Sequence, residues 1–155
     1  MGTLQSNKVK FAVTNCDIIQ SVNSLRILNA INRRASQLRK IIPILLQVDY
    51  SNCSYPKGLN LKETKKILQT ISESCEHVET RGIMTIAPLE YETDPKILRT
   101  FFAKTHTIFQ EEIMKKLEVD IPILSMGMSN DFEIAIEEGS NMVRIGTAIF
   151  GPRHI

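Results

Sequence analysis

The stretch that decides the fold is "LSMGMSNDFEIAIEEGSNMVRIGTAIFGPR", which runs from Leu124 to Arg153. A short apolar strand (121–127) leads into an acidic helix (129–138), and a second apolar strand (142–151) follows. Ser129 is expected to cap the helix, because a serine oxygen accepts hydrogen bonds from the free amides of a first turn. Two strands joined by a helix over so few residues predict a parallel βαβ unit.

The same alternation extends through the rest of the chain. Strands are also expected at 17–22, 41–49 and 80–88, and helices at 6–14, 23–37, 60–73 and 94–117. Asn23 and Asp94 are expected as N-caps, and Asn60 with Glu63 as a capping box. The unbroken apolar run at 41–49 is typical of a strand buried on both faces of a parallel sheet. The pattern predicts the α/β class, either as an open doubly wound sheet or as part of a (β/α)₈ barrel.

Length and composition narrow these alternatives. A complete (β/α)₈ barrel takes about 250 residues, whereas this chain has 155. We therefore expect one domain over residues 1–155, built as an open sheet or an incomplete barrel. The net charge of +2 is small and its residues are scattered, which argues against a nucleic-acid partner. No apolar run reaches the roughly 20 residues that span a bilayer, and we expect a cytoplasmic protein with no membrane partner.

Two of the predicted strand ends suit a phosphate group. Ligands of both α/β architectures bind at the carboxyl ends of the strands, and Ser129 lies at such an end, before a helix whose amides attract anions. At the next strand end, Gly146 permits close approach of the backbone and Thr147 adds a hydroxyl. Arg144 adds a permanent cation. Taken alone, these residues leave two interpretations equally open: a phosphate site, or an ordinary helix cap with turn-forming glycines.

Three motifs resemble one family. "LSMGMSNDFEIAIEEGSNMVRIGTAIFG" closely resembles the C-terminal signature of the pyridoxal phosphate homeostasis proteins, whose fold is like the N-terminal barrel of alanine racemase. "RGIMTI" (Arg81–Ile86) resembles the sixth barrel strand of that family, and "MGTLQSNK" (Met1–Lys8) resembles its third-strand motif. The resemblance implies an incomplete (β/α)₈ barrel that lacks roughly the first two strands.

The resemblance also implies a cofactor, pyridoxal 5′-phosphate (PLP). Ser129, Gly146 and Thr147 would hold its phosphate, and Arg144 would face the pyridine nitrogen. Because arginine cannot accept a hydrogen bond, it would keep that nitrogen unprotonated and mute carbanion chemistry.

The resemblance also implies a role for two methionines and a function for the chain. Met84 and Met126 would pack beside the cofactor ring, although both also suit ordinary core positions. The family implies a PLP-binding protein of intracellular vitamin B6 homeostasis without catalysis of its own. No metal site is expected, because the cysteines and histidines lack suitable spacing.

The chain departs from the family pattern at the cofactor mouth. The lysine that forms the Schiff base lies upstream of the third-strand motif in the family, and none of the lysines here is a persuasive substitute. Asp49, Cys53 and Pro56 stand where the family has asparagine, glutamate and lysine, and Thr3 where histidine or proline is common. We therefore expect non-covalent and impaired binding, and self-association through exposed sheet edges. A PLP-dependent racemase or decarboxylase, or a decayed remnant that binds nothing, are the alternatives.

Overall fold

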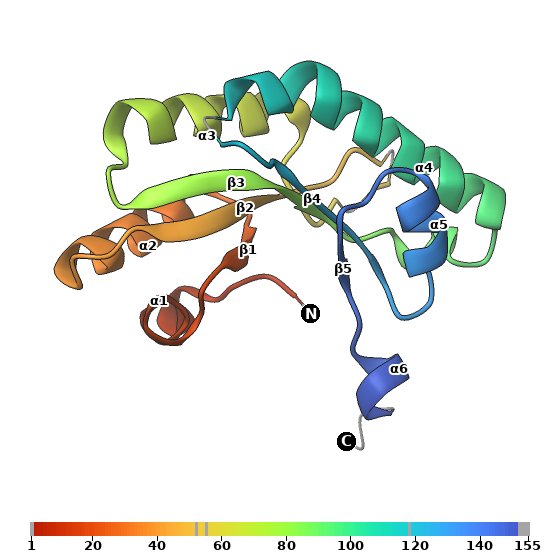
Figure 1. The fold of residues 1–155 in the computed structure, drawn as a ribbon, viewed down its shortest axis with the longest axis horizontal. Helices are drawn as coiled ribbons and strands as arrows, with labels where there is room; N and C mark the ends of the chain where they lie inside the picture. Colours follow the sequence, from red (N-terminus) through yellow and green to blue (C-terminus); the bar gives the residue numbers. More distant parts are fainter. Residues whose placement is uncertain (1, 52, 55, 118, 152–155) are drawn as a thin grey trace.

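The computed structural model describes residues 2–51, 53–54, 56–117 and 119–151. In these residues five parallel strands form one sheet, and each strand lies beside its predecessor in the chain (Figure 1). The strands are β1 (Ile19–Val22), β2 (Ile42–Val48), β3 (Val78–Thr85), β4 (Ile123–Met128) and β5 (Met142–Arg144). The α-helices are α1 (Val9–Asn15), α2 (Leu25–Gln37), α3 (Leu61–Ser74), α4 (Pro95–Ile108), α5 (Phe132–Glu137) and α6 (Thr147–Phe150). Other helical turns are η1 (Ser6–Lys8), η2 (Leu89–Tyr91), η3 (Phe109–Ile113) and η4 (Met114–Lys116).

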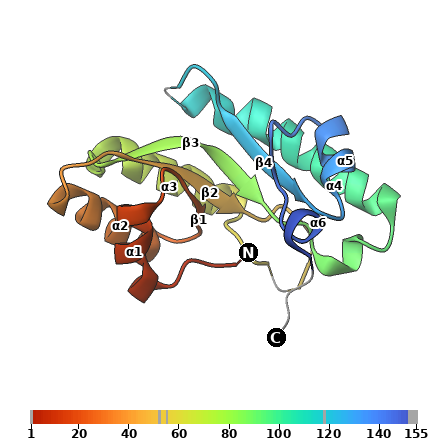
Figure 2. The ribbon, with the colours of Figure 1, turned by 60° about the horizontal axis from the view of Figure 1, so that its bottom comes forward.

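The order of the strands separates the two architectures that the sequence left open. A doubly wound sheet reverses its strand order at a switch point, whereas the order β1-β2-β3-β4-β5 never reverses. The sheet curves, and the helices α1 to α5 lie along its outer side (Figure 2). The described strands therefore form a half-barrel, and the prediction of an incomplete α/β barrel is confirmed.

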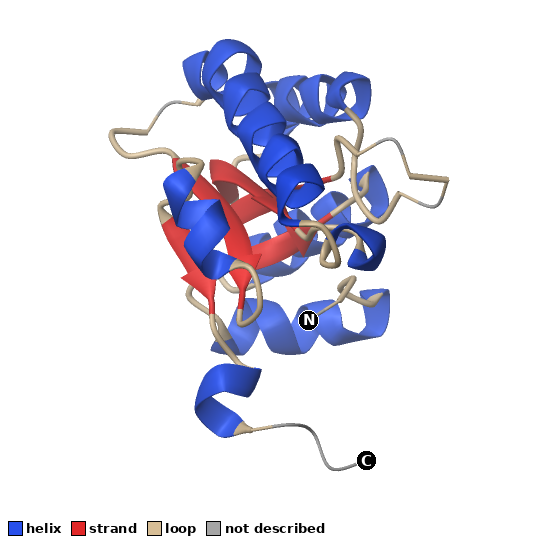
Figure 3. Cartoon of the chain, turned by 90° about the vertical axis from the view of Figure 1, so that its right-hand side faces the viewer, coloured by secondary structure: helices blue, strands red, loops and turns tan. Residues whose placement is uncertain are grey.

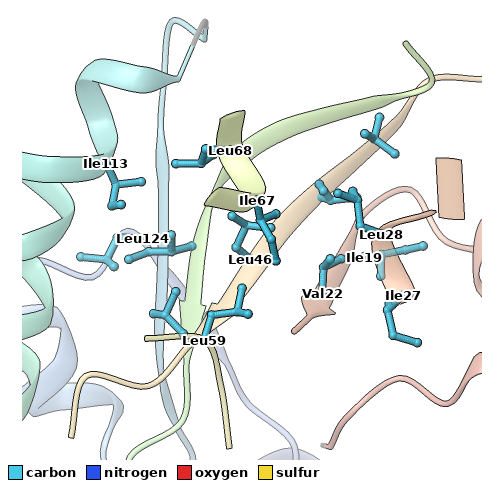
Figure 4. Close-up of a cluster of buried hydrophobic side chains, with 14 of the residues drawn as sticks. Ile19, Val22, Ile27, Leu28, Leu46, Leu59, Ile67, Leu68, Ile113 and Leu124 are labelled. Atoms are coloured by element: carbon cyan, nitrogen blue, oxygen red, sulfur yellow. The ribbon is translucent and has the colours of Figure 1, made fainter. Parts of the chain in front are cut away.

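One hydrophobic core fills the space between the sheet and its helices (Figure 4). Ile44 and Leu46 of β2 belong to this core, while Leu45 and Gln47 alternate to the other face of the strand. These two residues are also buried. The apolar run at 41–49 is thus covered on both sides, as expected for a parallel sheet.

The other face of the sheet, the concave face, carries polar side chains at its centre. We define it by Gln20, Gln47, Met84, Ser125 and Met142. The register aligns Gln47 with Met84, Met84 with Ser125, and Ser125 with Met142, which places these residues on one side. A glutamine and a serine in this position require hydrogen-bond partners, because an unpaired polar group is costly to bury.

Gly82 lets β3 pair closely with β4. Ile44 of β2 aligns with Thr80 and Leu45 with Gly82, so β3 has one extra residue at this point. Gly82 has a φ of 152°, and a Cβ added there would lie 1.8 Å from the carbonyl oxygen of Ile123. The extra residue and the absent side chain together allow the strands to meet.

Helix starts were predicted well where the signal is local. The Asn60–Glu63 capping box is present, and Asp94 caps α4 with Pro95 at its first position. The N-cap of α2 is Ser24, not Asn23. Its hydroxyl accepts from the backbone amide of Ile27, whereas the side-chain Nδ2 of Asn23 donates to the hydroxyl of Thr3.

Helix and strand ends were predicted less well. The helix expected at 94–117 ends as an α-helix at Ile108 and continues as the π turn η3 and the 3-10 turn η4. The helix expected at 129–138 begins only at Phe132. The strand expected at 142–151 ends at Arg144, and α6 follows instead. Figures 1 and 3 show α6 apart from the other helices, beyond the end of β5.

The third-strand motif at Met1–Lys8 does not form a strand in the described residues. Residues 2–5 lack regular structure, and η1 follows them. Gly2, Thr3 and Gln5 are exposed, so little buried surface holds this segment against β1. Among the described residues, every helix is too short or too polar to cross a membrane.

Candidate functional site

The β4–α5 and β5–α6 loops meet at the carboxyl end of the sheet. The hydroxyl of Ser129 accepts hydrogen bonds from the amides of Gly146 and Ala148, each at 3.2 Å. Ser129 is therefore not the cap of α5, since Asp131 occupies the N-cap position. The two loops that the sequence proposed for a phosphate are brought together, with an oxygen already bonded to two amides.

Two residues hold β5 in register with β4 and so place the second loop. The side-chain oxygen of Asn141 accepts from the amide of Leu124 at 2.8 Å. The hydroxyl of Ser140 donates to the carbonyl of Met126 at 2.7 Å. The short strand β5 is thereby fixed at its start, and Arg144 follows two residues after Met142.

Arg144 projects from the end of β5 toward β4 and β3. Its Nη1 lies 2.8 Å from the hydroxyl of Ser125, and its Nη2 lies 2.7 Å from the carbonyl oxygen of Thr85. Its Nε is buried without a hydrogen-bond partner. Burial lowers the pKa of Arg144 to about 10, and the charge of Asp131 opposes this change. The guanidinium is therefore held by neutral oxygens and remains charged at neutral pH.

A cavity of about 350 Å³ opens between these groups. It is lined by Glu92, Met128, Ser129, Asn130, Asp131, Arg144, Gly146, Thr147, Phe150 and Gly151. Four of the predicted site residues, Ser129, Arg144, Gly146 and Thr147, thus share one cavity. At Gly146, a Cβ would have no heavy atom within 4 Å, apart from its own chain neighbours.

Asp131 supplies negative charge on the same wall. It is 3% exposed, and its carboxylate accepts from the amide of Met128. Burial raises its pKa, the Met128 amide and the Arg144 charge lower it, and the charge of Glu92 raises it further. The cavity therefore places one arginine beside two carboxyl groups, so it attracts an anion less strongly than Arg144 alone would.

The two methionines lie outside the lining of this cavity. Met84 is 1% exposed and faces the concave side, aligned with Ser125. Met126 is fully buried in the core between the sheet and the helices. Their placement beside a cofactor ring stays a prediction.

The sequence interpretation did not single out Gln20, Ser125 or Asp131. The signal for Gln20 and Ser125 was weak, a polar residue within an apolar strand, and Asp131 lies in the turn that follows β4. In the described part of the chain, no group of three or more histidine, cysteine, aspartate or glutamate side chains could hold a metal ion.

A half-barrel of parallel strands with a polar cavity at its carboxyl end defines an α/β-barrel domain. The chain belongs to the family of the alanine racemase N-terminal domain, whose model matches residues 1–154. It is 35% identical to the pyridoxal phosphate homeostasis protein of Aquifex aeolicus, across 99% of this chain and 65% of that protein. It is 34% identical to the Homo sapiens protein of the same name, across 99% of this chain and 57% of that protein.

A solved structure resembles the half-barrel in space as well as in sequence. It is PipY of Synechococcus elongatus PCC7942 with PLP bound. The TM-score is 0.84 at 33% identity, and the match covers 97% of this chain and 68% of PipY. The chain spans less than two thirds of the length of the two curated relatives.

Proposed function

We propose that this chain binds PLP without a covalent bond and serves vitamin B6 homeostasis in the cytoplasm. The observation that carries the proposal is Arg144, a partly buried cation that lines the cavity. The ion pairs among the described residues do not include it. Its buried Nε lacks an acceptor, and an unpaired polar group is costly to bury, so a ligand that brings an acceptor to the guanidinium fits this position. The names of the relatives and the PLP in PipY support this choice of ligand.

The donors around the cavity fit the two ends of PLP. Ser129, Gly146 and Thr147 offer hydroxyl and amide donors for a phosphate. Arg144 has a buried Nε that lacks an acceptor, which the unprotonated pyridine nitrogen supplies. Met84 and Met126 are proposed as apolar neighbours of the ring, one on the concave face and one behind it.

We also propose that the bound cofactor does no catalysis in this chain. When bound, PLP supplies an electron-withdrawing ring that can stabilise a carbanion. Arg144 keeps the ring nitrogen neutral and weakens that effect, and none of the described residues that line the cavity is a lysine. Racemization of an amino acid by the purified chain, abolished by Arg144→Ala, would overturn this part of the proposal.

Binding is tested by titrating the purified chain with PLP, pyridoxal and inorganic phosphate, followed by calorimetry and by the absorbance of the ligand. PLP is expected to bind and pyridoxal to bind at least about tenfold more weakly, since it lacks the charge-assisted phosphate contacts. Equal binding of PLP and pyridoxal would contradict the phosphate site. If PLP does not bind, the proposed function is wrong, and the alternative of a decayed remnant that binds nothing is favoured.

Gly146→Ala sharpens the test. The added methyl group meets open space, so the melting temperature should barely change. If the phosphate occupies that space, affinity for PLP falls while affinity for pyridoxal does not. The matched control is Gly2→Ala, which also has open space around it but lies outside the cavity lining.

We further propose that the chain self-associates along β5. In the described sheet β5 pairs with β4 on one side only. Beyond its end, Ile149 and Phe150 of α6 are 66% and 84% exposed. An unpaired strand edge beside an exposed apolar pair favours pairing with a second copy.

A further inference from the structure

Gln20 and Arg144 lie on opposite sides of the half-barrel. Gln20 nevertheless contacts Ser125, the residue whose hydroxyl binds Arg144. Its Oε1 accepts a hydrogen bond from the hydroxyl of Ser125 at 2.9 Å. Gln20 belongs to β1 and Ser125 to β4, and two other strands lie between them in the sheet. The side chain therefore crosses the concave face directly.

The direction of each hydrogen bond in this group is set by chemistry. Arginine can only donate, so the Ser125 hydroxyl accepts from Nη1 of Arg144. The single proton of that hydroxyl must then go to another acceptor, and the amide oxygen of Gln20 is the one in reach. The Nε2 of Gln20 donates in turn to the sulfur of Met142 at 3.3 Å. The order Arg144, Ser125, Gln20, Met142 is thus consistent at every step.

Burial makes the hydrogen bond between Ser125 and Gln20 hard to replace. Ser125 is fully buried, so water cannot readily replace Gln20 as the acceptor of its proton. Without that acceptor the hydroxyl would turn toward another oxygen, and its lone pairs would no longer face Arg144. Of the two neutral acceptors of the guanidinium, only the carbonyl of Thr85 would remain.

We propose that Gln20 is a positioning residue for the ligand site: acting through Ser125, it fixes the guanidinium of Arg144 in the orientation that meets the ligand. This deepens the proposed function and rests on it for the identity of the ligand. It assigns a role in binding to β1, a strand that contributes no residue to the cavity lining.

The structural alternative is that Gln20 only stabilises the curved sheet. Gln47 provides a matched control, because it is a buried glutamine on the same face of the neighbouring strand β2. Its Nε2 donates to the carbonyl of Lys57, and it is not part of the Arg144 group. Gln20→Leu and Gln47→Leu should both lower thermal stability, whereas only the first should disturb Arg144.

The first measurement uses the ligand-free chain and follows the Nε–H signal of Arg144 by NMR, assigned with Arg144→Lys. Gln20→Leu and Ser125→Ala should each accelerate its exchange with water by about tenfold, the scale of one lost hydrogen bond to a charged group. Gln20→Glu, which keeps an acceptor for the hydroxyl, should restore slow exchange. Unchanged exchange in Gln20→Leu would overturn the inference.

The second measurement is the dissociation constant of PLP. Gln20→Leu should raise it about tenfold, Gln47→Leu should leave it unchanged, and Gln20→Glu should restore it. The double variant Gln20→Leu/Ser125→Ala should lose as much affinity for PLP as Ser125→Ala alone, because both changes break one connected group. Additive losses, or equal losses in Gln20→Leu and Gln47→Leu, would refute the positioning role.

The two proposals fail in different ways. If the wild-type chain does not bind PLP, the proposed function fails, while the exchange of Arg144 Nε–H still tests the contact with Gln20. If PLP binds and the Gln20 variants bind it equally well with unchanged exchange, only the positioning role is lost.

Discussion

At the scale of single residues, the sequence predicted which residues come together at the strand ends, but not the hydrogen bonds that they make. Ser129 was expected to cap a helix or to bind a phosphate; it does not cap α5, and its hydroxyl accepts from the amides of Gly146 and Ala148. Residue type and strand ends were enough to predict that these residues meet. The hydrogen bond between Gln20 and Ser125 joins positions 105 residues apart, and no local pattern contains that information.

Asp131 leads to a prediction about how stability depends on pH. Its pKa is raised in the folded protein, so its contribution to stability is full below the pKa of an unfolded aspartate and is lost as pH rises through the folded value. Asp131→Asn keeps an acceptor for the Met128 amide and removes the charge. Denaturant unfolding measured across acid to neutral pH should show the variant gaining stability relative to wild type as pH rises. A constant difference between the two proteins would contradict the burial of the charge.

At the scale of elements, starts were easier to predict than ends. The Asn60–Glu63 box and the Asp94–Pro95 pair act within one turn, so a short window of sequence reveals them. The end of α4 at Ile108 and the end of β5 at Arg144 depend on packing against distant segments. Apolar residues continue beyond both points, and a periodic pattern cannot show where regular hydrogen bonding stops.

The close pairing of β3 with β4 at Gly82 leads to a prediction about stability. In Gly82→Ala the new methyl group would collide with the carbonyl of Ile123, and the φ of 152° disfavours any side chain. We expect β3 and β4 to separate locally, with a loss of about 3 kcal/mol in the free energy of unfolding. Urea denaturation measures this loss. Gly146→Ala, where space is open, serves as the control, and similar effects of both substitutions would show that the strand contact is not the cause.

At the scale of the whole molecule, the alternation of strands and helices predicted the class, and the resemblance predicted the barrel. Strand order could not be obtained from periodicity, because both α/β architectures alternate in the same way. Within the described sheet, β1 and β5 each pair with a neighbouring strand on one side only.

The edge of the sheet at β5 leads to a prediction about self-association. Sedimentation velocity at increasing concentration should show association of the wild-type chain. Phe150→Asp should reduce it by placing a charge in the exposed apolar pair, an effect of about tenfold in the association constant if one aromatic contact is lost. Leu89→Asp, at a residue that is 70% exposed elsewhere, should not. Equal behaviour of the two variants would place the contact on another surface.

The hydroxyl of Ser129 has one further consequence for the kinetics of the site. It accepts from the amides of Gly146 and Ala148, beside the position proposed for the phosphate. An arriving phosphate oxygen would exchange places with a resident one, and neither loop would have to refold. If the proposed function holds, capture and release of the ligand should then be rapid.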